Sequence, residues 1–171
     1  VTIFIGVLFI LANLEKEFKL NLRQTFLFSS LAWVMVALFG SLPFVLSTQD
    51  FTFSEAFFES MSGITTTGAT IISDLDSSPK SILLWRAIMQ WLGGIGIVVM
   101  AITILPLLKV GGMQLFKMEG PDSTEKILPR TVEVAAIIIS TYIVLTFLCG
   151  FFYWVFGMTM FDSVSHAMTT I

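Results

Sequence analysis

Ser60-Met-Ser-Gly-Ile-Thr-Thr-Thr-Gly-Ala-Thr-Ile71 is a small, uncharged, Gly/Thr-rich stretch between two long apolar runs. The residues before it, 53–62, have a helical pattern, but at about 1.5 Å per residue they cross only half of a ~30 Å hydrocarbon core. A half-spanning helix followed by an irregular segment is typical of a re-entrant loop. Such backbone is tolerated at membrane depth only where it is buried in protein or lines a water-filled cavity. The rest of the chain is therefore expected to supply the walls of a cavity.

The composition is that of an integral membrane protein. Of 171 residues, 56% are hydrophobic and 12% are charged, against roughly 45–50% and about 25% in soluble domains. A net charge of −3 argues against a nucleic-acid partner. The single cysteine, Cys149, matches no disulfide or metal pattern. No P-loop, dinucleotide fingerprint, nucleophile elbow or HExxH motif occurs, so the sequence predicts neither an enzyme nor a bound cofactor.

Apolar runs long enough to cross a bilayer alternate with polar segments. The expected spans are 25–46, 81–108 and 132–156. Outside them, 1–24 is expected to hold the end of an earlier transmembrane helix and a cytoplasmic interfacial segment, and 110–131 a cytoplasmic loop. Because the chain starts inside an apolar run without an initiator Met, we expect it to be a piece of a longer protein.

Basic residues set the expected orientation. Most of them lie in the segments 13–24 and 109–130, which the positive-inside rule places in the cytoplasm. The half-helix then enters the membrane from outside. The region around its mouth carries several acidic residues, which would raise the local concentration of cations: Asp50, Glu55, Glu59, Asp74 and Asp76.

The chain also contains an internal repeat. A shift of 107 positions superimposes Glu55 on Asp162, Met61 on Met168 and Ile64 on Ile171. The repeated unit is helix, half-helix, loop, helix, with a complete first copy at 25–109 and the front of a second at 132–171. Both units start inside, so an axis along the membrane normal relates them. Parallel re-entrant loops around one axis describe a pore.

The expected pore helix, 53–63, would carry its negative dipole end to the membrane centre. An extended chain after it would aim the carbonyls of Ile64, Thr65, Thr66 and Thr67 at one axis, where they replace the hydration shell of a cation. Gly68 supplies a backbone angle that other residues avoid. On the local residues alone, an ordinary Gly/Thr connection between helices remains the alternative.

Four further residues bear on this candidate filter. Thr52 and Glu55 fit a capping box at the outer end of the half-helix. Glu59 lies inside the half-helix, where we expect structural support behind the filter in preference to direct tuning of cation binding. Arg86 either pairs with an acidic residue there or lies at the membrane interface.

The second half-helix is expected at about 161–171, with a second filter starting at Thr169, Thr170 and Ile171. His166 aligns with Glu59 in the repeat. A hydrogen-bonded, buried histidine is the favoured interpretation there, and a pH sensor is the alternative.

Four motifs together resemble the membrane subunit of Trk-type potassium uptake systems, TrkH-like members of the Trk/Ktr/HKT superfamily. They lie at 62–70, 85–96, 111–116 and 165–171. The resemblance implies an all-α integral membrane protein whose helix–pore-helix–helix repeats form a pseudo-fourfold cation pathway. It also implies K⁺ bound at Thr66, Thr67 and Gly68, with filter carbonyls extending over 64–68.

The same resemblance implies partners and a location. These are K⁺ as the transported ligand, a second copy in a homodimer, a cytosolic nucleotide-binding regulatory subunit, and the lipid bilayer of the bacterial inner membrane. A sodium-permeable relative of the superfamily and a non-conducting membrane scaffold are the alternatives. Whether uptake is channel-like or coupled to H⁺ or Na⁺ stays open.

Overall fold

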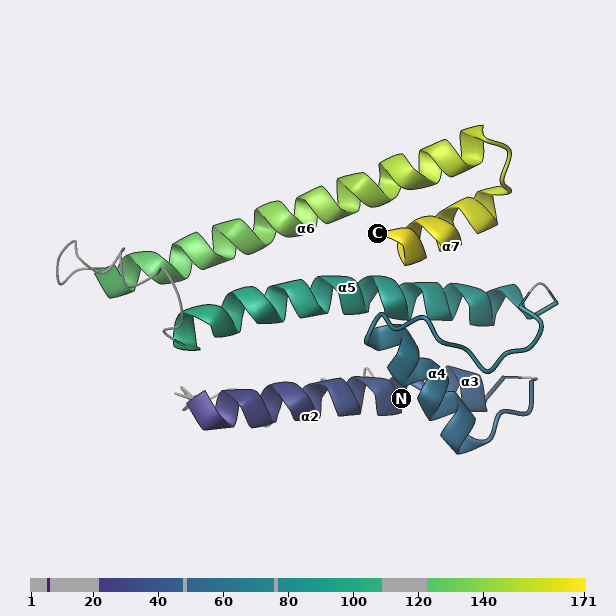
Figure 1. Cartoon of the computed structure of the whole chain (residues 1–171), viewed down its shortest axis with the longest axis horizontal. Helices are drawn as coiled ribbons and strands as arrows, with labels where there is room; N and C mark the ends of the chain where they lie inside the picture. Colours follow the sequence, from purple (N-terminus) through teal and green to yellow (C-terminus); the bar gives the residue numbers. More distant parts are fainter. Residues whose placement is uncertain (1–5, 7–21, 48, 76, 109–122) are drawn as a thin grey trace.

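The computed structural model describes residues 6, 22–47, 49–75, 77–108 and 123–171 (Figure 1). These residues form helices and connections without strands: α2 (Leu22–Gly40), α3 (Leu42–Val45), α4 (Phe53–Ile64), α5 (Lys80–Leu108), α6 (Ser123–Val155) and α7 (Met160–Thr170). Figure 1 shows α2, α5 and α6 as long rods, with the short α4 and α7 at the same end of the molecule. The interfacial segment expected before residue 22 and the motif at 111–116 lie outside the described residues.

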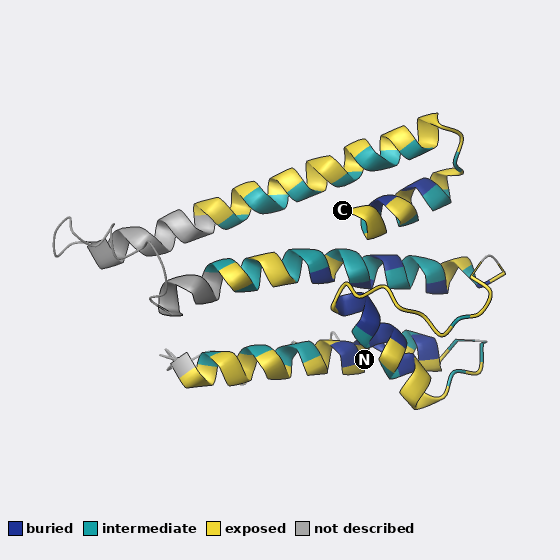
Figure 2. Ribbon diagram, in the orientation of Figure 1, coloured by how far each residue is buried: buried dark blue, intermediate teal, exposed yellow. Residues whose placement is uncertain are grey.

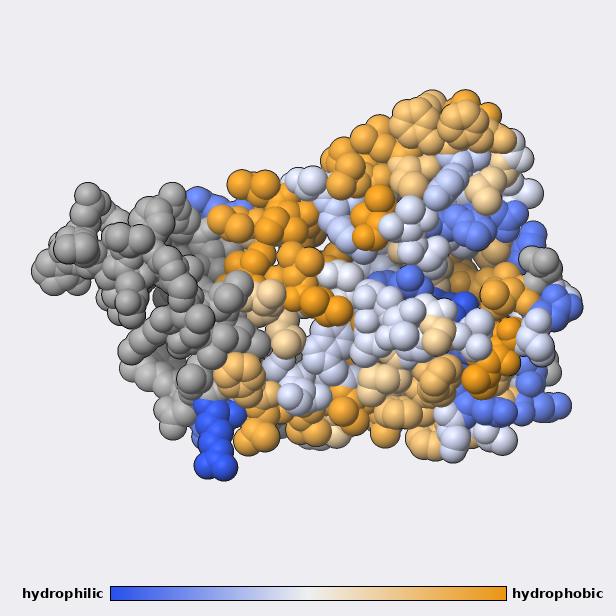
Figure 3. Space-filling view, viewed as in Figure 1, coloured by the Kyte–Doolittle hydropathy of each residue, from blue (hydrophilic) through white to orange (hydrophobic). Residues whose placement is uncertain are grey.

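Within the described residues, three stretches are long and apolar enough to cross a bilayer: Arg23–Val45, Lys80–Ile102 and Glu133–Val155. The third has none of its residues buried, and apolar side chains such as Phe147 (76% exposed) cover the surface of α6 (Figures 2 and 3). An exposed apolar surface of this extent is typical of a helix that contacts the hydrocarbon core of a membrane and not water. The chain is an all-α membrane protein.

The first span differs from the single helix expected over 25–46, because it breaks after Gly40 into α2 and α3. A Cβ on Gly40 would lie 2.5 Å from the terminal methyl of Met89 and 2.6 Å from the hydroxyl of Ser60 in α4, so a larger residue there would displace these side chains. The carbonyl of Gly40 accepts a hydrogen bond from the indole of Trp85 at 2.9 Å. Pro43 lies in the first turn of α3, where its missing N–H is tolerated.

The internal repeat is visible in the backbone. Asp50 and Gly157, which are 107 residues apart, both have left-handed φ angles, of 49° and 100°. Two residues later in each copy, Thr52 and Thr159 cap α4 and α7 through their side chains. The two half-helices therefore begin with the same turn and the same cap.

The core lies where α4 enters between α2 and α5. Ala37 of α2, Ile64 of α4 and Met89 of α5 form one buried cluster, and the dark-blue residues of Figure 2 gather there. Helix α5 packs on both half-helices, α4 and α7. It is therefore the element that joins the first unit to the second.

One element boundary needs correction. Helix α6 begins at Ser123, so residues 123–131 of the loop expected at 110–131 are helical, with Pro129 inside the helix. Its 33 residues reach about 50 Å, well beyond a ~30 Å core. The second half-helix is Met160–Thr170, within one residue of the expected bounds of about 161–171.

Candidate functional site

The N-terminal end of α4 is fixed by a capping box. The carboxylate of Glu55 accepts hydrogen bonds from the backbone N–H (2.8 Å) and hydroxyl (2.7 Å) of Thr52, and the N–H of Glu55 donates to the Thr52 hydroxyl at 3.4 Å. These bonds lower the pKa of Glu55 below its usual value. The predicted cap is confirmed, and it places a carboxylate at the positive end of the helix dipole.

The C-terminal end of α4 is a Schellman motif. The N–H of Thr66 donates to the carbonyl of Gly63 (2.9 Å), and the N–H of Thr67 donates to that of Ser62 (3.0 Å). Thr66 occupies the left-handed position, with φ 59°, although glycine normally fills it. A β-branched residue in this conformation costs on the order of 1–3 kcal/mol. The surrounding contacts therefore hold this turn in a strained geometry.

Ile64 was predicted to begin the extended filter, and this is wrong. It is the last residue of α4, it is 5% exposed, and its carbonyl oxygen lies against Gly93 of α5. A Cβ on Gly93 would overlap that oxygen. The absence of a side chain at Gly93 thus allows the tip of α4 to approach α5 closely. The candidate filter shortens to residues 65–68, here called the filter loop.

All residues of the filter loop are exposed. The hydroxyl of Thr65 donates to the carbonyl of Met61 at 2.7 Å and lies 2.9 Å from the hydroxyl of Thr67. Gly68 has φ 74°, and no atom lies within 4 Å of a Cβ placed on it. Backbone angle, not crowding, therefore requires glycine at this position.

Behind the filter loop lies a buried carboxylate. Glu59 is fully buried; its Oε1 accepts hydrogen bonds from the Thr70 hydroxyl and the Ile71 N–H, both at 2.7 Å. Its Oε2 lies 2.7 Å from Nε of Arg86, whose side chain is 16% exposed. Neither atom of this ion pair has a well-aligned hydrogen bond, so their attraction is chiefly charge on charge. Of the two interpretations of Arg86, pairing is correct.

Sequence reasoning missed the partners that complete this support. Thr70 and Ile71 bind Glu59, and the hydroxyl of Ser62 donates to the carbonyl of Ala69 at 2.6 Å. Together they connect the chain after the filter loop to α4. The sequence feature that could have predicted these donors is Glu59 itself, because a carboxylate buried in a half-helix needs hydrogen-bond donors nearby.

The second half-helix departs from expectation at its tip. Thr169 and Thr170, predicted to start a second filter, lie in α7, and both hydroxyls donate to the carbonyl of His166, at 3.1 and 2.7 Å. Their counterparts 107 residues earlier are helical as well, and only Ile171 follows the helix. His166 is exposed beside the ring of Tyr153, not buried as expected.

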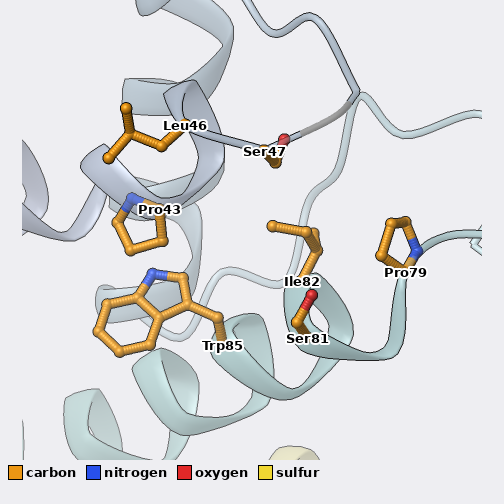
Figure 4. Close-up of a pocket in the computed structure, with 7 residues that line it drawn as sticks. All are labelled: Pro43, Leu46, Ser47, Pro79, Ser81, Ile82 and Trp85. Carbon is orange, nitrogen blue, oxygen red and sulfur yellow. The ribbon is translucent and has the colours of Figure 1, made fainter.

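A cavity of about 400 Å³ lies between α3 and the start of α5 (Figure 4). It includes no residue of the filter loop, so it is not part of the candidate ion site. Its lining residues are Pro43, Leu46, Ser47, Pro79, Ser81, Ile82 and Trp85. Among the described residues no cluster of His, Cys, Asp and Glu could hold a metal ion.

The structure is that of a membrane protein of the re-entrant-loop class. Its features are a capped half-helix, a Thr/Gly loop at the tip of that helix, and a second half-helix. The whole chain, residues 1–171, matches the TrkH family of cation transport proteins. The chain belongs to this family.

Individual proteins named as Trk potassium uptake proteins are similar to this chain. The Trk system potassium uptake protein TrkH of Vibrio parahaemolyticus is 42% identical over all of this chain and 36% of its own length. TrkI of Halomonas elongata is 47% identical over 86% of this chain and 30% of its own length. The crystal structure of the potassium transporter TrkH from V. parahaemolyticus matches with a TM-score of 0.72 and 40% identity, over 90% of this chain and 30% of that one. The chain thus spans about a third of these relatives.

Proposed function

We propose that this chain forms part of a potassium pathway and that the complete protein takes up K⁺ across the bacterial inner membrane. The observation that carries the proposal is the tip of α4: a half-helix ends in an exposed Thr/Gly loop, residues 65–68, held from behind by Glu59 and Arg86. The relatives named as potassium uptake proteins support the choice of ion. They are transport proteins and not enzymes.

The chemistry of the filter loop suits a monovalent cation. Carbonyl and hydroxyl oxygens of Thr65, Thr66, Thr67 and Gly68 are neutral ligands, and K⁺ would bind at the last three of these residues. Glu59, the nearest acidic residue before the loop, binds the chain after the loop and is paired with Arg86. One loop supplies too few oxygens for a dehydrated ion, so four such units would surround it. The 107-residue repeat supports this arrangement.

The remaining partners belong to the same proposal. We place the basic segments 13–24 and 109–130 in the cytoplasm. The cytosolic nucleotide-binding regulatory subunit implied by the resemblance would dock on that side, and a second copy of the chain would complete a homodimer. An outer mouth rich in acidic residues would then collect K⁺ from outside.

The test is ion uptake by the complete gene product in a host that lacks potassium uptake. Gly68→Ala forces a side chain onto a φ of 74°, and Gly68→Asp adds a charge there. Both variants are expected to lower K⁺ uptake or its preference over Na⁺ while protein remains in the membrane. Gly157→Ala is the matched control, because this glycine also has a positive φ and open space but lies between α6 and α7.

Three outcomes would contradict the proposal. Unchanged uptake and selectivity in both Gly68 variants would remove the filter loop from the ion pathway. Wild-type uptake that does not distinguish Na⁺ from K⁺ would favour the sodium-permeable alternative. No uptake of either ion by the wild type would favour a scaffold.

A further inference from the structure

One polar contact that holds the first half-helix has no counterpart in the second. In α4, the hydroxyl of Ser60 donates to the carbonyl of Ala37 at 2.7 Å. The corresponding position in α7, 107 residues later, is Ala167, and alanine has no hydroxyl to donate. Contacts of another kind therefore hold α7.

Helix α5 supplies one of them. The side-chain amide of Gln90 donates to the backbone carbonyl of Thr169 at 3.3 Å. Thr169 lies in the last turn of α7. Gln90 thus links α5 of the first unit to α7 of the second.

A second contact joins the same two helices at their outer ends. The ammonium group of Lys80, at the start of α5, lies 5.3 Å from the ring centre of Phe161, in the first turn of α7. From Lys80 to Gln90 the helix rises about 15 Å, and from Phe161 to Thr169 about 12 Å. The two contacts therefore hold α7 alongside α5 at both ends, with both chains running inward.

The turn of α5 that contains Gln90 also contacts the first half-helix, α4. Gly93, three residues after Gln90, lies against the carbonyl of Ile64 at the tip of α4. One turn of α5 thus contacts the inner ends of both half-helices. Any shift of α7 relative to this turn changes the position of its tip relative to the filter loop.

We propose that Gln90 is a positioning residue that sets the depth of the second half-helix relative to the first and thereby the selectivity of the pathway. Gln90 acts through Thr169 and does not bind the ion. The proposal deepens the function proposed above and rests on it. It predicts that loss of the amide donor changes selectivity more than it changes the amount of folded protein.

The test uses the complete gene product with Gln90→Met, which keeps the length of the side chain and its helix propensity but has no donor. Uptake of Rb⁺ and Na⁺ is measured beside the amount of protein in the membrane. We expect the preference for Rb⁺ over Na⁺ to fall roughly fivefold, the effect of one neutral hydrogen bond. Thr141→Val is the matched control, since its hydroxyl donates to the Ile137 carbonyl within α6 alone.

A second measurement does not depend on transport. Spin labels at Leu92 of α5 and Val164 of α7, both exposed, are introduced in a Cys149→Ser background. Gln90→Met is expected to broaden or shift the distance distribution between the labels, and Thr141→Val is not.

Three results separate the two proposals. A wild type that transports K⁺, with unchanged selectivity and distances in Gln90→Met, overturns the role of Gln90. Changed selectivity with unchanged distances overturns positioning as its mechanism. A wild type that transports neither ion overturns the proposed function, and the distances then still decide whether Gln90 positions α7.

Discussion

Arg86 and Glu59 form an ion pair across the interface between α5 and α4, with Nε and Oε2 2.7 Å apart and Glu59 fully buried. The other carboxylate oxygen binds Thr70 and Ile71. Arg86 thus neutralises the group that fixes the chain beyond the filter loop. A buried charge is tolerated only while it is paired and hydrogen-bonded.

Arg86→Gln is expected to destabilise the protein by about 3–5 kcal/mol, because it leaves the Glu59 carboxylate buried without its counter-charge. Thermal unfolding of the purified protein in detergent measures the loss. The double variant Glu59→Gln/Arg86→Gln should be less destabilised than Arg86→Gln alone, since it buries no unpaired charge. A double variant at least as unstable as Arg86→Gln would show that the pair does not act through charge.

Gly93→Ala tests the contact between α5 and the tip of α4. The added methyl group would overlap the carbonyl oxygen of Ile64, so α4 must shift, at a cost of about 1–3 kcal/mol. We expect a lower unfolding temperature together with altered ion selectivity. Gly96→Ala is the control, because its Cβ would meet only the edge of the Trp33 ring, at 3.3 Å. Equal effects of the two substitutions would contradict a specific role for the Ile64 contact.

The half-helix was predictable because its signals are local. Thr52 and Glu55 mark its start by spacing alone, and the 107-residue shift marks the second copy. Its end was not predictable in the same way. Glycine usually marks the left-handed residue that stops a helix, but Gly63 lies inside α4 and the position is filled by Thr66.

Errors at the tips of both half-helices have this one physical cause. Ile64 and Thr169 were assigned to extended filters, but both lie in helices whose tips contact α5. The ion-pair partner of Glu59, Arg86, and the donor to Thr169, Gln90, both come from that neighbouring helix. Such contacts depend on how helices pack, which local periodicity does not encode.

Thr66→Gly tests the strain at the end of α4. Glycine adopts a φ of 59° without steric cost, which relieves on the order of 1–3 kcal/mol. The greater freedom of glycine in the unfolded chain offsets roughly 0.5–1 kcal/mol of this. We expect an unfolding temperature equal to or above that of the wild type. A clear decrease would show that the Thr66 side chain makes a stabilising contact that outweighs the strain.

Thr52→Ala tests the cap and its pH dependence. Hydrogen bonds from Thr52 lower the pKa of Glu55 below its usual value of 4.5. The ionised carboxylate therefore stabilises the folded state above pH 4.5, and this contribution is lost as the pH falls through the lowered pKa. Thr52→Ala removes the hydroxyl donor, so the variant should be less stable than the wild type at pH 7, and the difference in unfolding temperature should narrow on acidification.

Thr159→Ala provides the comparison for this prediction. It removes the equivalent cap of α7, where the Thr159 hydroxyl donates to Asp162 at 2.7 Å. Because both half-helices begin with the same Thr–acid pair, the two variants are expected to lose stability at pH 7 in the same direction. A difference between wild type and Thr52→Ala that stays constant from pH 7 to below pH 4 would mean that the cap acts through the neutral hydroxyl alone and not through the charge of Glu55.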